Sequence, residues 1–566
     1  MIQTLKKAIE KRLGSDEFEI KIENSLERGH LSTNAAFVLA EKENLAPLQA
    51  AEELRSSLHQ NAPGDFFDRI EVGGGGFLNI WLSKEAIQGQ LAKIAKAGSG
   101  WARVKGRKKE AVIIEYSSPN IAKPMHIGHL RSTIIGDAIA NVFEFLGYKT
   151  VRWNYIGDWG TQFGKLIVAY KRWGNKGKVR KNPIEELDKL YVRFHQELKE
   201  HPELEAEGRE EFHKLEQGNK GNRKLWRWFK KESLKEFGKI YNRLGINFSV
   251  HVGEAYYEKD LTGIIDLLKE EKVVYESEGA LIADLERFGL PPAMVRKSDG
   301  STLYLTRDIA SLKHRIKEYD PKKILYVVAN EQALHFSQLF ALAKSTDLVE
   351  GAAMPELTHV KFGLVRGETG KKFSSREGTG IKLEELLSRA VELAKQALVE
   401  RDVSFKKDEM KEVSETVGIG AVKYNDLSQN RLSDIVFDWD KMLSFDGNSG
   451  PYLQYTYARL RSILKKARRV PKLDLSTLES ESDQALVLKL AEFPDVLERV
   501  RRSYMPSYLA SYLHELAKQV NSYYHSEPVL YSEPSLRALR LNLVKSTAIT
   551  LRNGLRLLGI KTIERM

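Results

Sequence analysis

Two histidines at spacing i, i+3 form the clearest chemical signature of the chain. His126 and His129 enclose Gly128, and the segment lies between a short apolar run and a helical pattern. Imidazoles can donate hydrogen bonds to phosphate oxygens, a glycine lets the backbone approach closely, and a helix N-terminus adds partial positive charge. Such groups could stabilise the charge that develops on a phosphate under attack. Surface histidines that only cap a helix are the alternative, but Asn120 and Lys123 just upstream favour the phosphate site.

A second candidate is the basic, serine-rich segment 370–378, which has a glycine at each end. A helical pattern from Leu383 to Leu398 follows it. A loop of this composition could clamp a triphosphate, although an ordinary exposed loop can have the same composition. Its polar side chains include Lys371, Lys372, Ser374, Ser375 and Arg376.

The elements around the first segment predict where it lies. Ala111 to Tyr116 is typical of a buried parallel strand, and a helix is expected from about Gly128 to Leu146. Further strands are expected at Thr150 to Tyr155 and at Ile324 to Val328. These units predict an α/β fold with a doubly wound, Rossmann-type parallel sheet. Ligands bind at the carboxyl ends of such strands, which is where the two histidines would lie.

The length and patterning of the chain predict its domains. At about 100–200 residues per domain, 566 residues predict roughly three. Residues 1–105 mix helical and strand patterns and are expected to form a small N-terminal α+β domain. Residues 106–400 would hold the parallel sheet, with a charged helical insertion near 171–240. Residues 401–566 have helical patterns and predict an all-α bundle.

Charge and composition limit the function classes. The net charge of +12 divides into −2 over residues 1–100, +9 over 101–400 and +5 over 401–566. A basic chain often binds polyanions such as nucleic acid, although a solvated surface without a partner can carry the same charge. The absence of cysteine excludes disulfides and Cys-ligated metals, and no helical His/Glu spacing predicts another metal site. Without an apolar run of ~18 residues or a signal peptide, the chain is expected to be cytoplasmic.

The two candidate segments, 126–129 and 372–376, resemble the HIGH and KMSKS signatures of class I aminoacyl-tRNA synthetases. Their surroundings resemble arginyl-tRNA synthetases in particular, in order and over essentially the whole chain. The segments that carry this resemblance are 117–126, 128–136, 154–164, 298–308, 442–445, 450–455 and 556–566. The resemblance implies that the carboxylate of arginine attacks the α-phosphate of ATP, and that the 3′-terminal ribose of the tRNA then takes the arginyl group.

The resemblance also implies how ATP is held. His126 and His129, with Gly128 between them, match residues that contact the phosphates, and Ser374 and Ser375 fall in the loop that assists. ATP is expected as its Mg²⁺ complex, with no metal bound tightly by the protein itself.

One departure from the family pattern concerns a lysine. The KMSKS signature normally carries a second lysine, but this chain has Ser375 at that position, followed by Arg376. Many arginyl-tRNA synthetases lack this lysine and have one just before HIGH, where Lys123 lies here. We therefore expect Lys123 to neutralise phosphate charge during activation, with Lys372 or Arg376 assisting.

A site for arginine must meet a planar, permanently charged guanidinium with five donors, so it needs acceptors in fixed geometry. Asp308 and Glu254 fall at the family's guanidinium-binding positions, and Tyr304 lies one helical turn before Asp308. From sequence chemistry alone, Asp308 could instead form a salt bridge with Arg307 or Lys313. The resemblance also places in the arginine site, near the α-amino and carboxyl groups, Ser118, Asn120 and Gln332.

Contacts to tRNA are implied at both ends of the chain. The N-terminal domain resembles the family domain that touches the tRNA elbow near the D-loop, with Phe77 and Asn79 as candidates. The C-terminal helices resemble the anticodon-binding bundle, where Tyr524 could stack on a base, and Met566 is a further candidate. Where some relatives carry another aromatic residue, this chain has Pro528. By the same resemblance we expect a monomer without an obligate protein partner, and arginine activation that depends on bound tRNA.

Three alternatives remain open. A synthetase for another amino acid is disfavoured by Tyr304 and Asp308, because apolar substrates need no buried acid. An inactive paralogue that only binds RNA is disfavoured by the intact HIGH residues. An adenylyltransferase that does not act on tRNA would share the HIGH chemistry, but such chains seldom carry a large C-terminal helical domain.

Overall fold

The computed structural model describes residues 1–23, 26–106, 108–366, 382–401 and 405–566. These residues form two compact units. The first comprises Met1–Val104, Leu398–Tyr424 and Met442–Met566, and the second comprises Lys105–Ala397 and Asn425–Lys441. Within the described ranges, no helix is long and apolar enough to cross a membrane.

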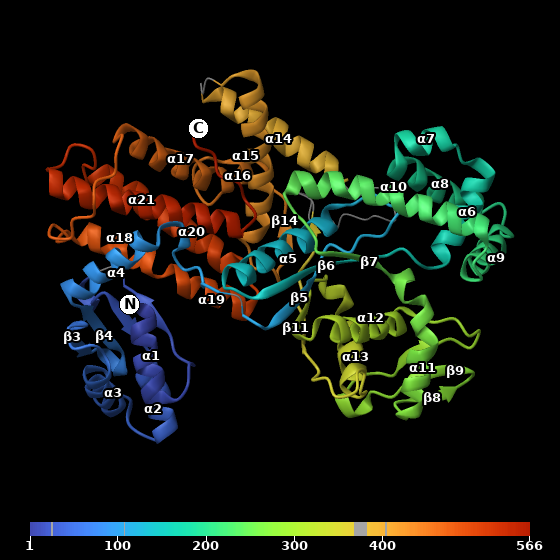
Figure 1. Cartoon of the computed structure of the whole chain (residues 1–566), viewed down its shortest axis with the longest axis horizontal. Helices are drawn as coiled ribbons and strands as arrows, with labels where there is room; N and C mark the ends of the chain where they lie inside the picture. Colours follow the sequence, from blue (N-terminus) through green and yellow to red (C-terminus); the bar gives the residue numbers. More distant parts are fainter. Residues whose placement is uncertain (24–25, 107, 367–381, 402–404) are drawn as a thin grey trace. The chain divides into compact units, whose positions relative to one another are not determined.

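The second unit is built on a parallel five-stranded sheet (Figure 1) with the order β12-β11-β5-β6-β7. Its strands are β5 (Ala111–Glu115), β6 (Lys149–Ile156), β7 (Val250–Gly253), β11 (Pro321–Tyr326) and β12 (Glu356–His359). The chain runs outward from β5 to β7 and then returns to the other side of β5, so the strand order reverses between β5 and β11. The predicted parallel, doubly wound sheet is confirmed, and this reversal is where such sheets bind ligands.

Helices cover both faces of this sheet (Figure 1). Helix α5 (Ile127–Phe145) packs on one face, and α12 (Tyr304–Tyr319) and α13 (Ala333–Lys344) cover the other. Side chains of β5 alternate between them: Ile113 joins the core beneath α12, whereas Tyr116 meets α5 at Gly136. The strand and helix predicted at residues 111–116 and 128–146 are therefore confirmed to within two residues at each end.

A helical insertion separates β6 from β7, as the sequence predicts. It consists of α6 (Thr161–Trp173), α7 (Lys176–Lys181), α8 (Pro183–Glu197), α9 (Leu204–Glu216) and α10 (Lys220–Leu244). Helices α6 and α9 approach closely because glycines lie at their crossing: a Cβ on Gly164 would lie 2.0 Å from the carbonyl oxygen of Gly208.

Smaller elements complete the second unit. The antiparallel sheet β10-β9-β8 lies between α11 and α12 in the sequence, and the pair β13–β14 flanks α14 and α15. Their bounds are α11 (Leu261–Glu270), β8 (Val274–Ser277), β9 (Ala280–Ala283), β10 (Ala293–Arg296), β13 (Val365–Arg366), α14 (Leu383–Glu400), α15 (Lys407–Leu427) and β14 (Ile435–Val436). Of these, α14 lies mostly in the second unit, whereas α15 lies mostly in the first. Helix α14 confirms the helix expected from residue 383.

The first unit combines a four-stranded antiparallel sheet with helices, in the strand order β1-β2-β4-β3. The N-terminal elements are α1 (Ile2–Leu13), β1 (Ile20–Ile22), β2 (Leu31–Thr33), α2 (Ala35–Glu43), α3 (Pro47–Asn61), β3 (Phe67–Val72), β4 (Leu78–Leu82) and α4 (Lys84–Ala97). The C-terminal helices are α16 (Trp439–Leu443), which belongs partly to each unit, α17 (Gly450–Lys466), α18 (Glu481–Ala491), α19 (Phe493–Ser503), α20 (Ser507–Ser526) and α21 (Pro534–Leu557). The α+β and all-α characters predicted for the two ends are confirmed.

Within the first unit, the residues after α4 are tied to C-terminal helices. The Trp101 indole Nε1–H donates to the carbonyl of Leu490 at 3.0 Å, and Asn553 Nδ2 donates to the carbonyl of Ser99 at 3.0 Å. The N-terminal sheet and the C-terminal helices therefore belong to one compact unit.

The close packing of α5 on the sheet makes a stability prediction. A Cβ on Gly136 would lie 2.3 Å from Cβ of Tyr116, so we expect Gly136→Ala to lower the free energy of unfolding by about 1–3 kcal/mol. Gly238 in α10 is the matched control, because nothing lies within 4 Å of its added Cβ. There the same substitution should raise stability by about 0.5–1 kcal/mol, since alanine favours a helix. Urea unfolding followed by circular dichroism measures both, and equal effects would contradict the packing account.

Candidate active site

His126 and His129 lie where the chain passes from the end of β5 into α5. His126 is the N-cap residue: its Nδ1 accepts from the Gly128 N–H at 3.1 Å, and its own N–H donates to Nδ1 of His129 at 3.2 Å. The ring centroids are 4.0 Å apart. A Cβ at position 128 would lie 2.9 Å from Cε1 of His126, which explains the glycine.

This arrangement determines which ring nitrogens can bind a ligand. Because Nδ1 accepts in both rings, the neutral imidazoles carry their protons on Nε2. Burial lowers the pKa of His126, and burial together with the neighbouring His126 lowers the pKa of His129 to about 3. Neither Nε2 has a hydrogen-bond partner among the described residues. The pair caps the helix and also presents two uncharged donors at its N-terminus.

The loop that leads into this segment has an unusual backbone. Ser117, Ser118 and Ala122 all have positive φ, at 73°, 47° and 61°, although none is glycine. Such a concentration is typical of functional loops, whose conformation the surrounding structure must enforce. Part of that support comes from α5, where Ser132 Oγ accepts from the Ser117 N–H at 2.9 Å and donates to the carbonyl of Val327 at 2.7 Å. This hydroxyl thereby joins the ends of β5 and β11 at the reversal of strand order.

Helix α10 of the insertion supports the same loop. Ser233 Oγ accepts from the Ala122 N–H at 2.9 Å, and the Tyr241 hydroxyl lies 2.8 Å from Ser117 Oγ. Asn154, on β6, donates to the same tyrosine oxygen at 3.1 Å and accepts from the Ser118 N–H at 3.1 Å. These residues hold the strained loop from the helix side and the strand side, and the sequence analysis assigned none of them a role.

The N-terminal half of α10 holds a second loop through Asp158. Lys230 Nζ lies 2.6 Å from Asp158 Oδ2, and the Trp226 indole donates to the Asp158 carbonyl at 2.7 Å. Trp226, Lys230, Ser233 and Tyr241 lie at helical spacings that place them on one face of α10. The sequence pattern that could have indicated these supporting residues is their shared face on α10. The many charged residues of the insertion made that pattern hard to recognise.

Asp158 also fixes the backbone beside Glu254. Its Oδ1 accepts from the Ala255 N–H at 2.9 Å, and a Cβ on Gly253 would lie 2.1 Å from Oδ2. Burial, followed by the charges of Asp308 and Asp158, raises the pKa of Glu254 to about 8. At neutral pH this carboxyl therefore holds a proton unless a cation comes close.

Asp308 and Tyr304 occupy the first two turns of α12, at the carboxyl edge of the sheet. The ion pair of Asp308 joins its Oδ2 to Nε2 of His335 at 2.7 Å, so the pairing with Arg307 or Lys313 considered above is wrong. Arg307 instead donates to Thr302 Oγ1 at 2.8 Å. The Tyr304 side chain is 58% exposed, which leaves its hydroxyl accessible.

A buried ion pair lies beneath these acids. Glu115, the last residue of β5, pairs with Arg315 of α12, and both side chains are almost completely buried. The Arg315 guanidinium also lies 4.5 Å from the Trp153 ring and 5.3 Å from the Tyr326 ring. Burial raises the pKa of Glu115, and Asp308 adds to that shift while Arg315 opposes it. The sequence analysis did not identify this pair, whose members are 200 residues apart.

The remaining predicted residues of the site are distributed as follows. Lys123 Nζ lies 4.7 Å from the ring centroid of Tyr191 on α8, and burial lowers its pKa while Asp188 opposes the shift. Asn120 lies against Gly157, where a Cβ would come within 1.8 Å of its Oδ1. Ser118 Oγ is buried without a described partner, whereas Gln332 is exposed in the 3₁₀ turn η6 (Asn330–Gln332). Outside the described residues are Lys372, Ser374, Ser375 and Arg376.

The described residues on both sides of segment 367–381 are hydrogen-bonded to α5 or to a residue just before it. Before it, the carbonyl of Gly363 accepts from Arg131 Nη1 at 2.7 Å, and Arg131 pairs with buried Asp426 at 3.1 Å. After it, the Leu383 N–H donates to the carbonyl of Met125 at 2.9 Å. Arg131 therefore joins α5 to Gly363 and to Asp426, although no pattern in the sequence indicated this.

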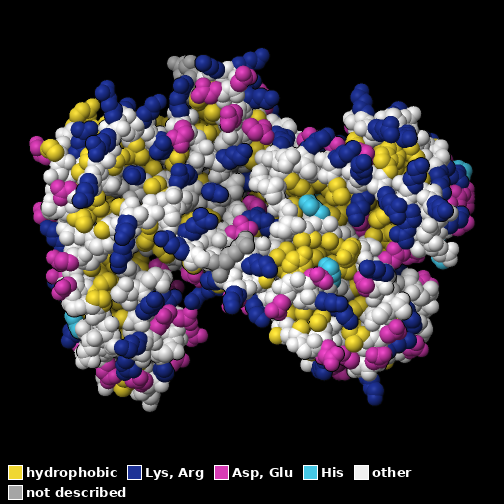
Figure 2. Space-filling view, viewed as in Figure 1, with side chains coloured by type: hydrophobic (Ala, Val, Ile, Leu, Met, Phe, Trp, Pro, Cys, Tyr) yellow, Lys and Arg dark blue, Asp and Glu magenta, His cyan; other side chains and the backbone are white. Residues whose placement is uncertain are grey.

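The predicted tRNA-contacting residues lie in the first unit. Phe77 precedes β4 and is 46% exposed, and half-buried Asn79 lies within that strand. Tyr524, near the end of α20, is 37% exposed, and Met566 is half-buried. Figure 2 shows Lys and Arg side chains spread over the visible face with acidic side chains between them. On this face, the net charge therefore does not gather in one patch.

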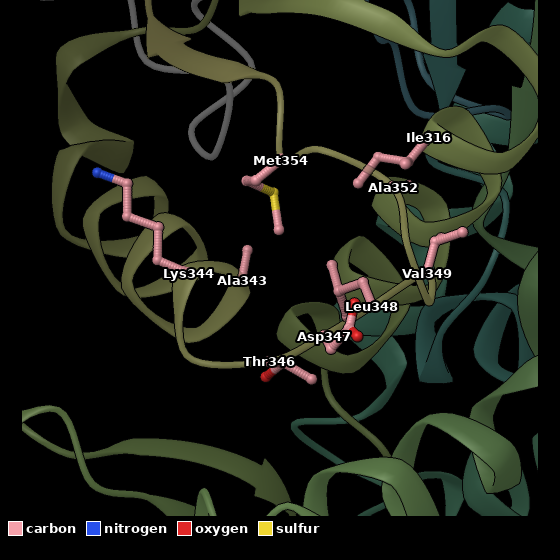
Figure 3. A pocket seen from close by; sticks show the side chains of 9 residues that line it. All are labelled: Ile316, Ala343, Lys344, Thr346, Asp347, Leu348, Val349, Ala352 and Met354. Carbon is pink, nitrogen blue, oxygen red and sulfur yellow. The ribbon is translucent and has the colours of Figure 1, made fainter.

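A cavity of 220 Å³ lies at the other ends of α12 and α13 (Figure 3). Ile316 and Ala343 line it, two helical turns beyond Asp308 and His335 respectively. None of the predicted site residues lines this cavity, so it is distinct from the candidate site. Among the described residues, no group of three or more His, Asp or Glu could hold a metal ion.

Comparisons with known proteins agree with this geometry. The family described as "tRNA synthetases class I (R), catalytic domain" matches residues 91–439. The arginyl-tRNA synthetase N-terminal domain matches residues 1–82, and the DALR anticodon-binding domain matches 453–566. A parallel sheet with HIGH at its β5–α5 turn, together with the first of these matches, defines a class I aminoacyl-tRNA synthetase.

Whole-chain relatives specify the family. An arginine–tRNA ligase of Enterococcus faecalis is 42% identical over 568 residues, covering 100% of this chain and 99% of the relative. Another, from Halothermothrix orenii, is 42% identical over 92% of this chain and 91% of its own length. The crystal structure of Plasmodium falciparum arginyl-tRNA synthetase superposes with a TM-score of 0.83 at 30% identity, covering 100% of this chain and 98% of that one. The chain belongs to the arginyl-tRNA synthetases.

The buried pair beneath the site makes a prediction about stability. In Arg315→Met, Glu115 would be buried without its partner, so we expect a loss of about 3–5 kcal/mol in the free energy of unfolding. The folded variant would hold the Glu115 proton at a pH where the unfolded chain releases it. The loss should therefore grow as the pH rises above the ordinary pKa of a glutamate. The double variant Glu115→Met/Arg315→Met should recover at least half of it, and urea unfolding that shows no recovery would contradict this account.

Proposed function

We propose that this chain is an arginine–tRNA ligase that activates arginine with ATP and transfers it to the 3′-terminal ribose of its tRNA. Identity of 41–42% to arginine–tRNA ligases over 92–100% of this chain supports the activity. The observation that carries the choice of arginine is the set of acids at the carboxyl edge of the sheet. Asp308 and Glu254, with the Tyr304 hydroxyl, supply the acceptors that a guanidinium requires.

For the nucleotide, we propose that ATP enters as its Mg²⁺ complex and that its phosphates lie at the N-terminus of α5. His126 and His129 would donate from Nε2, which carries the proton of each neutral ring. Gly128 allows the close backbone approach. Lys123 would neutralise the charge that develops on the α-phosphate, and its half-buried position strengthens that interaction. We assign Lys372, Ser374, Ser375 and Arg376 the supporting contacts that the family pattern implies.

For arginine, we propose that Asp308 and Glu254 accept guanidinium protons and that Tyr304 closes over them. Glu254 would give up its proton when the guanidinium arrives, because the cation stabilises the carboxylate. The α-amino and carboxyl groups would then lie near Asn120 and Gln332. The unpartnered hydroxyl of Ser118 supports its place in the same site, since a buried hydroxyl gains from a ligand that bonds to it.

For tRNA, we propose a division of three domains at residues 1–105, 106–400 and 401–566. Phe77 and Asn79 would contact the elbow, whereas Tyr524 and Met566 would serve the anticodon end. The exposure of Phe77 and Tyr524 supports stacking on bases. We also propose that the protein is a cytoplasmic monomer and that it activates arginine only when tRNA is bound. Pyrophosphate exchange with arginine but without tRNA would contradict the requirement for tRNA.

Charging of total tRNA with each standard amino acid, radiolabelled in turn, tests the function. We expect attachment of arginine alone. Asp308→Asn should lower kcat/KM for arginine by about 10- to 100-fold, because a charge-assisted hydrogen bond is lost. The matched control is Asp266→Asn on an exposed position of α11, which should behave as the parent protein. Filter binding of tRNA without any charging would contradict the proposal and favour an RNA-binding paralogue.

The pKa of Glu254 predicts a pH dependence. With a pKa of about 8 this group is neutral in the empty site below that pH, and guanidinium binding requires its ionised form. The KM for arginine should therefore fall by roughly 25-fold between pH 6.5 and pH 8.5, and then level off. In Glu254→Gln, the KM for arginine should no longer change with pH between about pH 7 and pH 8.5. Pyrophosphate exchange in the presence of tRNA measures it, and an unchanged slope in the variant would exclude Glu254 as the source.

A further inference from the structure

We propose that His335 is a positioning residue for arginine recognition: it holds one carboxylate oxygen of Asp308 and thereby directs the other toward the guanidinium. This inference rests on the proposed function, since it concerns how the same site selects its amino acid.

The contact between the two side chains is short and directional. His335 lies in the first turn of α13 and Asp308 in the second turn of α12, with Nε2 and Oδ2 2.7 Å apart. A carboxylate only accepts, so Nε2 must donate. The side chains are 27% and 20% exposed, which places the contact at the wall of the site and not on the open surface. Among the described residues, none hydrogen-bonds to Oδ1 of Asp308.

The charges around His335 favour this arrangement. Burial opposes a charge on its ring, but the hydrogen bond and charge of Asp308 outweigh that effect and raise its pKa, with Glu115 adding to the shift. Asp308 faces it from α12 and Glu115 from β5, where Arg315 already pairs with Glu115. The imidazole is therefore expected to remain bonded to Oδ2 of Asp308, because its other acidic neighbour, Glu115, is already paired with Arg315.

The consequence for recognition is geometric. With one lone pair of Oδ2 engaged by His335, Oδ1 is the oxygen of Asp308 that keeps both lone pairs for guanidinium protons, and Glu254 and the Tyr304 hydroxyl would accept the remaining donors. Without His335 the carboxylate could rotate about its terminal torsion, which has a broad profile. Arginine would then have to order that carboxylate on binding, and this cost would weaken recognition of the guanidinium end specifically.

The test compares His335→Phe, which removes the donor, with His335→Gln, which keeps an N–H donor near Nε2. Leu334→Ala is the matched control, because it changes an exposed neighbour in the same helical turn. Pyrophosphate exchange with tRNA gives the KM for arginine, the KM for ATP and kcat. Agmatine, which is arginine without its carboxylate, is used as a competitive inhibitor that probes the guanidinium end alone.

We expect His335→Phe to raise both the KM for arginine and the inhibition constant of agmatine by about tenfold, with kcat and the KM for ATP within about twofold. His335→Gln should restore both constants to within about threefold, and Leu334→Ala should match the parent protein. Unchanged constants for arginine and agmatine in His335→Phe would overturn the proposal. So would an equal loss in kcat and in the ATP constant, or a failure of glutamine to rescue. If the parent protein charges no tRNA with arginine, the proposed function itself fails, and that result is distinct from any of these.

Discussion

Four carboxyl groups lie at one edge of the parallel sheet, and the site depends on how their negative charges are compensated. Glu115 is balanced by Arg315, Asp158 by Lys230 and a backbone N–H, and Asp308 by His335. For Glu254, the charge of Arg307 and a backbone hydrogen bond from Trp159 do not outweigh burial and the charges of Asp308 and Asp158, so its pKa is raised to about 8. Like charges at these distances cannot all ionise without compensation. The empty site is therefore short of one cation, and arginine carries a permanent one in a planar form that several acceptors can share.

The part of the site proposed for the nucleotide differs from the acidic part, because its two histidines are neutral. The two imidazoles of the HIGH segment cap α5 through Nδ1, so the phosphate binding that we propose for Nε2 would use the opposite sides of the same rings. Their loop keeps three non-glycine residues at positive φ. Hydrogen bonds from α5, β6 and α10 hold that loop, so the helical insertion supports the site and is not a peripheral addition.

Local patterns in the sequence predicted the framework well. The apolar run at residues 111–116 and the helical spacing after it predicted β5 and α5 correctly, with the HIGH segment between them. What the sequence did not reveal are contacts between distant positions. Glu115 and Arg315 are 200 residues apart, and Asp308 meets His335 across a strand, so no periodicity connects them. For Asp308, local chemistry suggested Arg307 or Lys313 because a neighbour in sequence is the simplest partner. On a helix, however, adjacent residues point in different directions.

We expect arginine to supply the missing cation and to displace the proton of Glu254. Calorimetric titration of arginine into the protein, repeated at pH 7 in buffers of different ionisation enthalpy, counts that proton directly. The account predicts release of about one proton per arginine bound, and loss of most of this release in Glu254→Gln. Binding with no net proton release, or with proton uptake, would contradict it.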